Sequence, residues 1–391
     1  MRDERKDYLT MCIAGFLTNT TMGLSFSMTP LYASEFTNSL FLIGFAVSGY
    51  FIIRMFSEIP WGLLSDKTGR KKPIIMGAIL EMIGAALGGA ASSVYHLILG
   101  RIFWGVGSAA YFCVGTSAIA DLFPKEKRGS ALGAFQGIQS LGMAFGAYLS
   151  GHIVLSIGYG NLFYTCAAIL FVTLVLFLSL SLKSPNSESK INAKSTRITD
   201  VFRIFANPVM IVVSVMIFSL MIQNSGLMNS TFPLYLKFDL NMSVIDVGTL
   251  SALVTIGTAS GNIVGGWLSD KIGRLRVLGS AFVFGAIGLF LMPSANSFWT
   301  LAPLAGLAGL CFGFVYSVAP VLVSENFSSS IRGMAIGVYR TSFDIGGFLG
   351  PFVTATVATF SSNRVAFYFV SALLSLNILV AFWLRKMKRT S

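Results

Sequence analysis

Between two long apolar runs the chain reads Gly62-Leu-Leu-Ser-Asp66-Lys-Thr-Gly69-Arg70-Lys71-Lys72. About half a chain later, again between apolar runs, it reads Gly266-Trp-Leu-Ser-Asp270-Lys-Ile-Gly273-Arg274-Leu-Arg. A charged loop that recurs at this distance indicates two copies of one membrane unit.

The residues of this loop suit the edge of a membrane. The first glycine of each copy leaves a small surface that a neighbouring helix backbone can approach, and the second allows the backbone of a tight turn. Arg70, Lys71 and Lys72 are expected among lipid headgroups. The aspartate needs a cation or a helix N-terminus as its partner. An ordinary basic loop explains one copy, but two spaced copies make that explanation improbable.

Composition places the whole chain in a membrane. Of its 391 residues, 54% are hydrophobic and only 11% are charged, which is less charge than soluble domains carry. Apolar runs long enough to cross a bilayer recur along the chain. We expect twelve spans, at about 9–33, 41–65, 73–92, 96–120, 130–153, 159–182, 208–236, 244–268, 276–294, 298–323, 333–358 and 364–385.

The basic residues define the orientation. Most of the 28 Lys and Arg residues fall in alternate loops, starting with the N-terminus, whereas the other loops hold only Lys237 and Arg364. This asymmetry predicts that both termini and a polar connector lie in the cytoplasm, in a multi-pass protein of the cytoplasmic membrane. It also accounts for the net charge of +12 without a nucleic-acid partner. The predicted domains are residues 1–182, the connector 183–207, and 208–391.

A second pair of loops keeps the same offset. The segment from Asp121 to Gly133 aligns with the segment from Glu325 to Gly337, and acid, Phe, Arg, Gly, Ala and Gly keep their places. Similarity that preserves loop residues fits two six-helix halves.

Both copies of the opening loop resemble the Gly-x-x-x-Asp-(Arg/Lys)-x-Gly-Arg motif of the major facilitator superfamily. There it lies between helices 2 and 3 and again between helices 8 and 9. The resemblance implies an all-α integral membrane protein with twelve transmembrane helices in two pseudo-symmetric six-helix halves. It also implies four contacts that close the cytoplasmic side: Asp66 with the start of span eleven near Gly333, Arg70 with Asp121, Asp270 with the start of span five near Gly129, and Arg274 with Glu325.

Two further motifs resemble the antiporter branch of that family. Arg101-Ile-Phe-Trp104-Gly105-Val-Gly107 is similar to its helix-4 motif, with Trp104 in place of Gln. The glycine ladder from Gly133 to Gly146 is similar to its helix-5 motif, although Ala147 stands where that motif has Pro. Tight helix packing explains the ladder equally well.

Ionisable side chains inside apolar spans are costly and usually functional. Arg54/Glu58 and Arg340/Asp344 are each four residues apart, so each pair shares a helix face. We expect proton coupling at Asp344, near the membrane midplane, with Glu58 as second choice; the alternative is that the pairs only join helices. The full set of candidates is Asp344, Glu58, Glu81, Arg340, Arg54 and Arg101.

Uncharged polar residues mark a candidate substrate cavity shared by the two halves. Each is equally consistent with hydrogen bonding between helices. They are Asn19, Tyr111, Gln136, Gln139, Gln223, Asn224, Asn229 and Tyr316.

The predicted function is secondary active transport by alternating access. No Walker loop, catalytic triad or metal-ligand spacing is present in the sequence, so an enzyme or ATP-driven pump is not expected, and no cofactor or metal is required. The resemblance favours proton-coupled export of small amphipathic organic compounds or drugs by a monomer. Proton-coupled symport of a sugar or organic acid, with Arg101 or Arg340 binding a carboxylate, is the alternative. A non-transporting membrane sensor is the alternative from another class.

Overall fold

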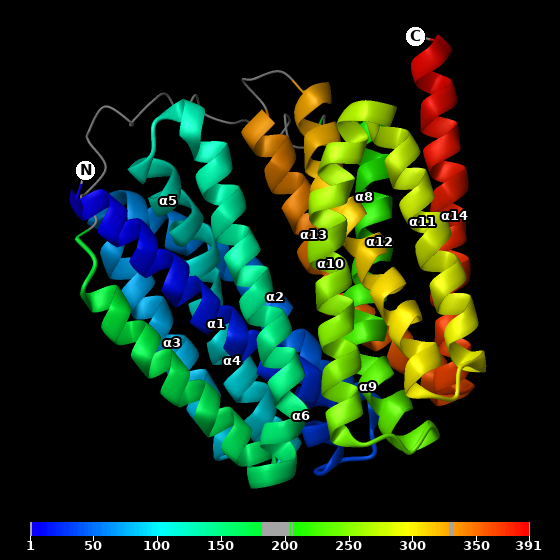
Figure 1. The fold of residues 1–391 in the computed structure, drawn as a ribbon, viewed down its shortest axis with the longest axis horizontal. Coiled ribbons are helices and arrows are strands. Elements are labelled where there is room, and N and C mark those ends of the chain that lie inside the picture. Colours follow the sequence, from blue (N-terminus) through cyan, green and yellow to red (C-terminus); the bar gives the residue numbers. More distant parts are fainter. Residues whose placement is uncertain (1, 182–203, 205, 328–331, 391) are drawn as a thin grey trace. The chain divides into compact units, whose positions relative to one another are not determined.

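A computed structural model describes residues 2–181, 204, 206–327 and 332–390. This part of the chain is helical and contains no strand (Figure 1). The helices are α1 Arg2–Ser34, α2 Leu40–Thr68, α3 Lys71–Gly89, α4 Val94–Ala110, α5 Thr116–Leu122, α6 Lys125–Leu178, α8 Pro208–Met221, α9 Phe232–Leu234, α10 Val244–Ile272, α11 Arg274–Leu291, α12 Phe298–Asn326, α13 Arg332–Phe360 and α14 Asn363–Thr390.

Among the described residues, 11 helices are long and apolar enough to cross a membrane. One of them, α6, has 54 residues and a length of about 80 Å, more than twice a bilayer core. It breaks at Gly158, whose φ of 83° and ψ of 170° are not helical, and its ribbon turns back on itself in Figure 1. The helix therefore contains two of the predicted spans, and all twelve predicted spans are present. Where a loop was expected between them, a single glycine makes the turn.

Two spans contain π-helical turns that the hydropathy pattern did not predict. They occupy Tyr111–Gly115 in the span Val94–Leu122, and Ile222–Thr231 with Tyr235–Asp239 in the span Pro208–Asp239. Such turns widen a helix locally and recur at functional sites.

The structure divides into two compact units, Met1–Asn192 with Ser243–Ala252, and Ala193–Met242 with Leu253–Ser391. The predicted connector lies almost wholly outside the described residues, so the predicted domain boundaries stay a prediction.

Glycines let helix backbones approach closely within each unit. A Cβ built at Gly142 would lie 2.3 Å from the carbonyl oxygen of Phe16, and one at Gly146 would lie 2.0 Å from that of Thr20. In the second unit a Cβ at Gly350 would lie 3.0 Å from the backbone nitrogen of Gly226. The packing interpretation of the ladder is thus confirmed at these positions.

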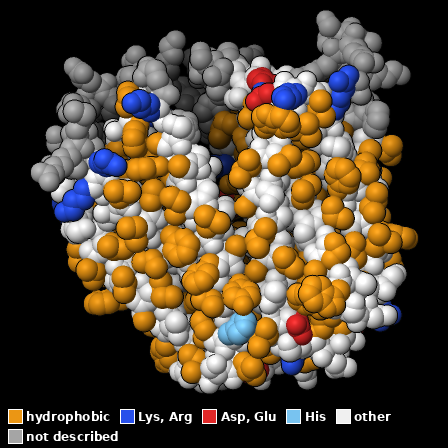
Figure 2. Space-filling model, viewed as in Figure 1, with side chains coloured by type: hydrophobic (Ala, Val, Ile, Leu, Met, Phe, Trp, Pro, Cys, Tyr) orange, Lys and Arg blue, Asp and Glu red, His pale blue; other side chains and the backbone are white. Residues whose placement is uncertain are grey.

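Large apolar side chains lie on the outside of the helices, as expected for a lipid-facing surface. On α2, Phe56, Ile59 and Leu63 are 63%, 73% and 60% exposed. Hydrophobic side chains gather over the visible face in Figure 2, with charged side chains near the helix ends. This distribution is the reverse of a soluble protein surface.

Candidate functional site: repeated arginine clusters and buried charges

The loop between α2 and α3 is organised by Arg70. Its Nε donates to Asp121 at 3.0 Å, and its Nη1 donates to Ser65 at 2.8 Å and to Asp66 at 2.9 Å. The side chains of Asp66 and Asp121 are 69% and 48% exposed, whereas the arginine side chain is only 16% exposed. The expected contact between Arg70 and Asp121 is confirmed, and Asp66 pairs with the same guanidinium.

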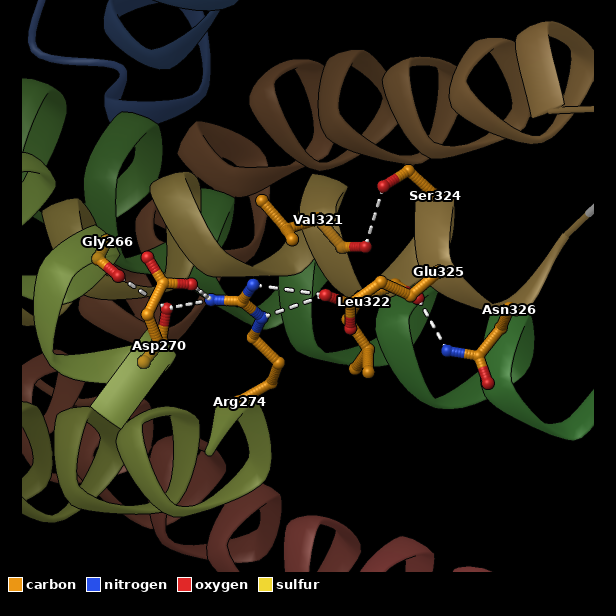
Figure 3. Close-up of polar contacts among 9 residues, drawn as sticks. Gly266, Asp270, Arg274, Val321, Leu322, Ser324, Glu325 and Asn326 are labelled. Atoms are coloured by element: carbon orange, nitrogen blue, oxygen red, sulfur yellow. Dashed lines mark hydrogen bonds and ion pairs between the residues drawn. The ribbon is translucent and has the colours of Figure 1, made fainter. Parts of the chain in front are cut away.

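The second unit repeats this geometry, as Figure 3 shows. Arg274 lies between Asp270 and Glu325, with Nε and Nη2 both donating to Glu325 Oε1, at 3.2 and 3.0 Å. Its Nη1 donates to Asp270 and, at 2.6 Å, to Ser269. The expected contact between Arg274 and Glu325 is confirmed.

The two serines in these clusters were not among the predicted residues. Ser65 and Ser269 are both buried, and each fixes one edge of the arginine. The sequence contained a signal for them, because Leu-Ser-Asp-Lys occurs in both copies at the same offset.

The turn glycines behave as expected, whereas other parts of the motif differ. Gly69 and Gly273 have φ values of 84° and 95°, which only glycine adopts readily. The first glycines show no close backbone approach within their own unit. Gly62 has only Cys113 Sγ, 3.7 Å from an added Cβ, and Gly266 has nothing within 4 Å.

Lys71 corrects one expectation about the basic run. Its ammonium donates to the carbonyl oxygens of Leu178 and Leu180, at 2.8 and 2.6 Å, so it caps the end of α6 instead of lying among lipid headgroups. Unpaired carbonyls at a helix C-terminus attract such a cation. Arg70 likewise binds protein groups, and Lys72 is exposed.

The remaining loop arginines are Arg128 and Arg332. Arg128 donates its Nε to the carbonyl oxygen of Phe123 at 3.0 Å, which ties α6 to the end of α5. The Arg332 side chain lies outside the described residues.

On α2, Arg54 and Glu58 form the expected pair, with Nε and Oε1 3.8 Å apart. The arginine also lies over the rings of Tyr50, Phe51 and Phe112, with its guanidinium carbon 5.7, 5.6 and 5.8 Å from their centroids. The Arg54 guanidinium therefore packs against three aromatic rings inside the first unit.

On α4, Arg101 is only 1% exposed. Its Nη1 donates to Ser25 at 3.1 Å. Its guanidinium carbon lies 4.6 Å from the ring centroid of Phe26, 5.2 Å from that of Tyr50 and 5.4 Å from that of Trp104. Nε and Nη2 have no hydrogen-bond partner among the described residues.

Glu81 is fully buried on α3, and neither carboxyl oxygen has a hydrogen-bond partner in the described part of the chain. Its side chain lies against Gly107 of α4, where an added Cβ would come within 2.7 Å of Glu81 Cγ. Gly107 thus makes room for the backbone of α3 and for the Cγ of this side chain.

In the second unit, Asp344 is 3% exposed near the middle of α13, whereas Arg340 is exposed. Their partnership stays a prediction.

The predicted cavity residues fall into two separate groups. In the first unit Gln139 donates to the Tyr111 hydroxyl at 3.1 Å, Asn19 is buried and donates to the carbonyl oxygen of its own-helix Gly15 at 2.9 Å, and Gln136 is exposed. Neither the Gln139 contact nor the Asn19 contact involves the other unit, so the shared cavity stays a prediction.

The second group lies in the second unit, with three members in the π-helical segment Ile222–Thr231 and Tyr316 in α12. Gln223 donates to the carbonyl oxygen of Ala308 at 2.8 Å, and Asn229 donates to Asn224 at 3.2 Å. Tyr316 stacks on Phe312, with centroids 5.7 Å apart. Of these contacts, only that between Gln223 and Ala308 connects span seven to a neighbouring helix, α12.

A helical membrane protein with a duplicated arginine–acid loop and charged residues buried within its spans has the features of a secondary transporter. The family model of the Major Facilitator Superfamily matches residues 11–235 and 219–391. The chain belongs to this family; it is a transporter and not an enzyme.

Its relatives include a multidrug resistance protein, MdtG, from Proteus mirabilis, 27% identical over 93% of this chain and 92% of that protein. The sialic acid transporter NanX of Escherichia coli is 27% identical over 85% of this chain and 82% of its own.

Solved structures show the same fold. A bacterial homologue of the human lysosomal transporter Spinster, in its inward-facing unoccupied conformation, has a TM-score of 0.81 at 16% identity, over 97% of this chain and 96% of that one. A D-xylose–proton symporter has a TM-score of 0.79 at 17% identity, over 96% of both chains.

Proposed function

We propose that this chain works by alternating access and exports small amphipathic organic compounds or drugs in exchange for protons across the cytoplasmic membrane. The observation that carries the proposal is the buried carboxyl group of Asp344 within the apolar span α13. A charged carboxylate in such a position costs free energy unless it is protonated or paired with a cation. Alternation between these two forms can be coupled to transport. The similarity to a multidrug resistance protein along most of both chains supports export.

The proposed coupling uses exchange of partners. With Arg340 engaged, Asp344 releases its proton; with Arg340 drawn toward substrate or Glu58, it binds one. Arg340 lies one helical turn from Asp344, which puts the guanidinium within reach of the carboxylate. Asp344 thus binds a proton in one state and pairs with the Arg340 cation in the other.

The loop clusters supply the proposed gate. In each unit one arginine binds two acids and a serine, so the carboxylate of Asp66 or Asp270 is held at a fixed position at the end of its helix. From there it would meet the N-terminus of a helix near Gly333 or Gly129 and stabilise the state closed to the cytoplasm.

Reconstitution into proteoliposomes tests this function. A panel of labelled amphipathic compounds is loaded, a pH gradient is imposed, and solute and proton fluxes are recorded together. Opposite fluxes that a protonophore abolishes are expected. Fluxes in the same direction would favour the symport alternative, and no flux for any compound would favour the sensor alternative.

Symport of a sugar or organic acid remains the second candidate because of two features. Arg101 is a buried cation with open donors, and a sialic acid transporter is among the relatives. Adding sialic acid and simple sugars to the panel includes this candidate in the same experiment.

A further inference from the structure

The guanidinium of Arg101 has one occupied side and one open side. Nη1 is bound by Ser25, while Nε and Nη2 are buried and without a hydrogen-bond partner among the described residues. These two nitrogens form a single edge of the guanidinium plane. It is the edge with which Arg274 binds Glu325 in the second unit.

A neighbouring side chain also has an unpaired donor. The indole Nε1 of Trp104 is buried and has no partner in the described part of the chain, and its ring centroid is 5.4 Å from the Arg101 guanidinium carbon. Buried donors without acceptors are rare in native structures and each costs free energy. Two unpaired donors on Arg101 and a third on the neighbouring Trp104 favour an acceptor with negative charge as their ligand.

The surroundings specify the rest of that acceptor. Phe26, Tyr50 and Trp104 place aromatic rings around the guanidinium at 4.6, 5.2 and 5.4 Å. An apolar body beside a carboxylate matches these rings and the open edge together. All three rings are buried, with exposed fractions of 6%, 1% and 0% for Phe26, Tyr50 and Trp104.

We propose that Arg101 is the binding site for the carboxylate of an amphipathic organic acid, held by Nε and Nη2 with the Phe26, Tyr50 and Trp104 rings around its apolar part. This inference rests on the proposed export of amphipathic compounds and narrows their class to carboxylic acids.

A carboxylate could also come from the protein itself. Glu81 is buried in the same unit, and both of its oxygens lack hydrogen-bond partners among the described residues. In this structure it lies against Gly107, six residues along α4 from Arg101, and does not pair with the arginine. The experiment therefore includes Glu81.

The test is calorimetric binding to the purified full chain, without a pH gradient. The probes are 6-phenylhexanoate and 6-phenylhexanamide, which differ only in the charged group. A bidentate charge-assisted contact predicts that the acid binds about tenfold more tightly than the amide, or better. Equal affinities for the wild-type chain would overturn the proposal without any variant.

Variants identify the residue responsible. Arg101→Lys keeps the charge and removes the fork, so the preference for the acid should fall below about threefold, while the exposed Arg364→Lys should retain it. An unchanged preference in Arg101→Lys would overturn the proposal. A preference for the acid that appears in Glu81→Gln but not in the wild-type chain would also overturn the proposal. The Glu81 carboxylate would then be the natural partner of the Arg101 guanidinium.

The experiments distinguish failure of the carboxylate site from failure of the proposed export. Acid-selective binding without proton-driven flux would contradict the proposed export but not the carboxylate site. Proton-driven export of amphipathic compounds with equal binding of acid and amide would contradict the site alone.

Discussion

The loop arginines show why the motif needs this residue type. Arg70 donates to three side chains from two directions, and Arg274 does the same in the second unit. A planar guanidinium presents five donors in a fixed fork, whereas an ammonium is a point charge on a flexible stem. The acid side chains are 48% to 69% exposed, so these bonds add little to folding stability. Their value lies in fixing where the aspartate points.

We therefore expect Arg70→Lys to reduce transport more than stability. Losing one charge-assisted bond in the closed state would shift the equilibrium between states by about tenfold, while the stability should change by less than about 1 kcal/mol. Initial flux in proteoliposomes and thermal unfolding in detergent measure the two effects. The exposed Arg276→Lys is the control. A flux equal to that of the wild type would show that the cluster has no gating role.

The acid partners of these arginines were predicted from the resemblance of both loops to the family motif, and the structure confirms both contacts. It did not predict that Lys71 binds the end of α6, or that aromatic rings surround Arg101. Both contacts depend on which helix faces meet, and hydropathy does not determine the rotation of a helix. The burial of Glu81 was not predictable either, because it depends on how α3 packs on α4, which places Glu81 opposite Gly107.

Among the elements, α1 and α6 depend on glycine where they meet. Their backbones approach so closely at Gly142 and Gly146 that a Cβ at either position would overlap a carbonyl oxygen of α1. Gly133 belongs to the same ladder, yet nothing lies within 4 Å of its added Cβ. The ladder thus combines required and dispensable glycines in one helix.

Gly146→Ala should destabilise the first unit by about 1–3 kcal/mol, because α1 and α6 must separate to admit the methyl group. Gly133→Ala should be neutral or stabilising by up to about 1 kcal/mol, since alanine favours the helix and meets no neighbour. Apparent unfolding midpoints at one scan rate compare the two variants with the wild type. Equal midpoints for both alanine variants would contradict the packing interpretation.

The helices themselves were largely predictable, because each span is a continuous apolar run. Their irregularities were not. The turn inside α6 needs a single glycine with positive φ, and the π-helical turns near Tyr111 and Gln223 have no hydropathy signature. The second of these turns is held by Thr354, which donates to the carbonyl oxygen of Gly226 at 3.0 Å, a contact between residues far apart in the sequence.

At the scale of the molecule, the positions of Lys and Arg predict which loops face the cytoplasm. In a cysteine-free background, Ser92→Cys between α3 and α4 should react with a membrane-impermeant maleimide in intact cells. Lys72→Cys, at the start of α3, should react only after permeabilisation. Both positions are exposed, so side-chain accessibility does not separate them. The opposite labelling pattern would invert the orientation, and with it the direction assigned to export.

Coupling is also a property of the whole molecule, since a proton and a solute must bind alternately on the two sides of the membrane. Asp344→Asn removes the titratable group and retains the size and hydrogen bonding of the side chain. Solute accumulation driven by a pH gradient should be lost, whereas energy-independent exchange of labelled for unlabelled solute should continue, because exchange does not require a net proton movement.

Glu58→Gln is the matched variant in the first unit, where the acid pairs with Arg54. If Asp344 couples protons, Glu58→Gln keeps accumulation and only changes its rate. Accumulation at the wild-type level in Asp344→Asn would exclude that residue as the coupling site, and its loss in Glu58→Gln alone would transfer the role to α2. If both variants lose exchange as well as accumulation, the two acids act in binding or folding, and the proton pathway must use another buried carboxyl group, of which Glu81 is the remaining predicted candidate.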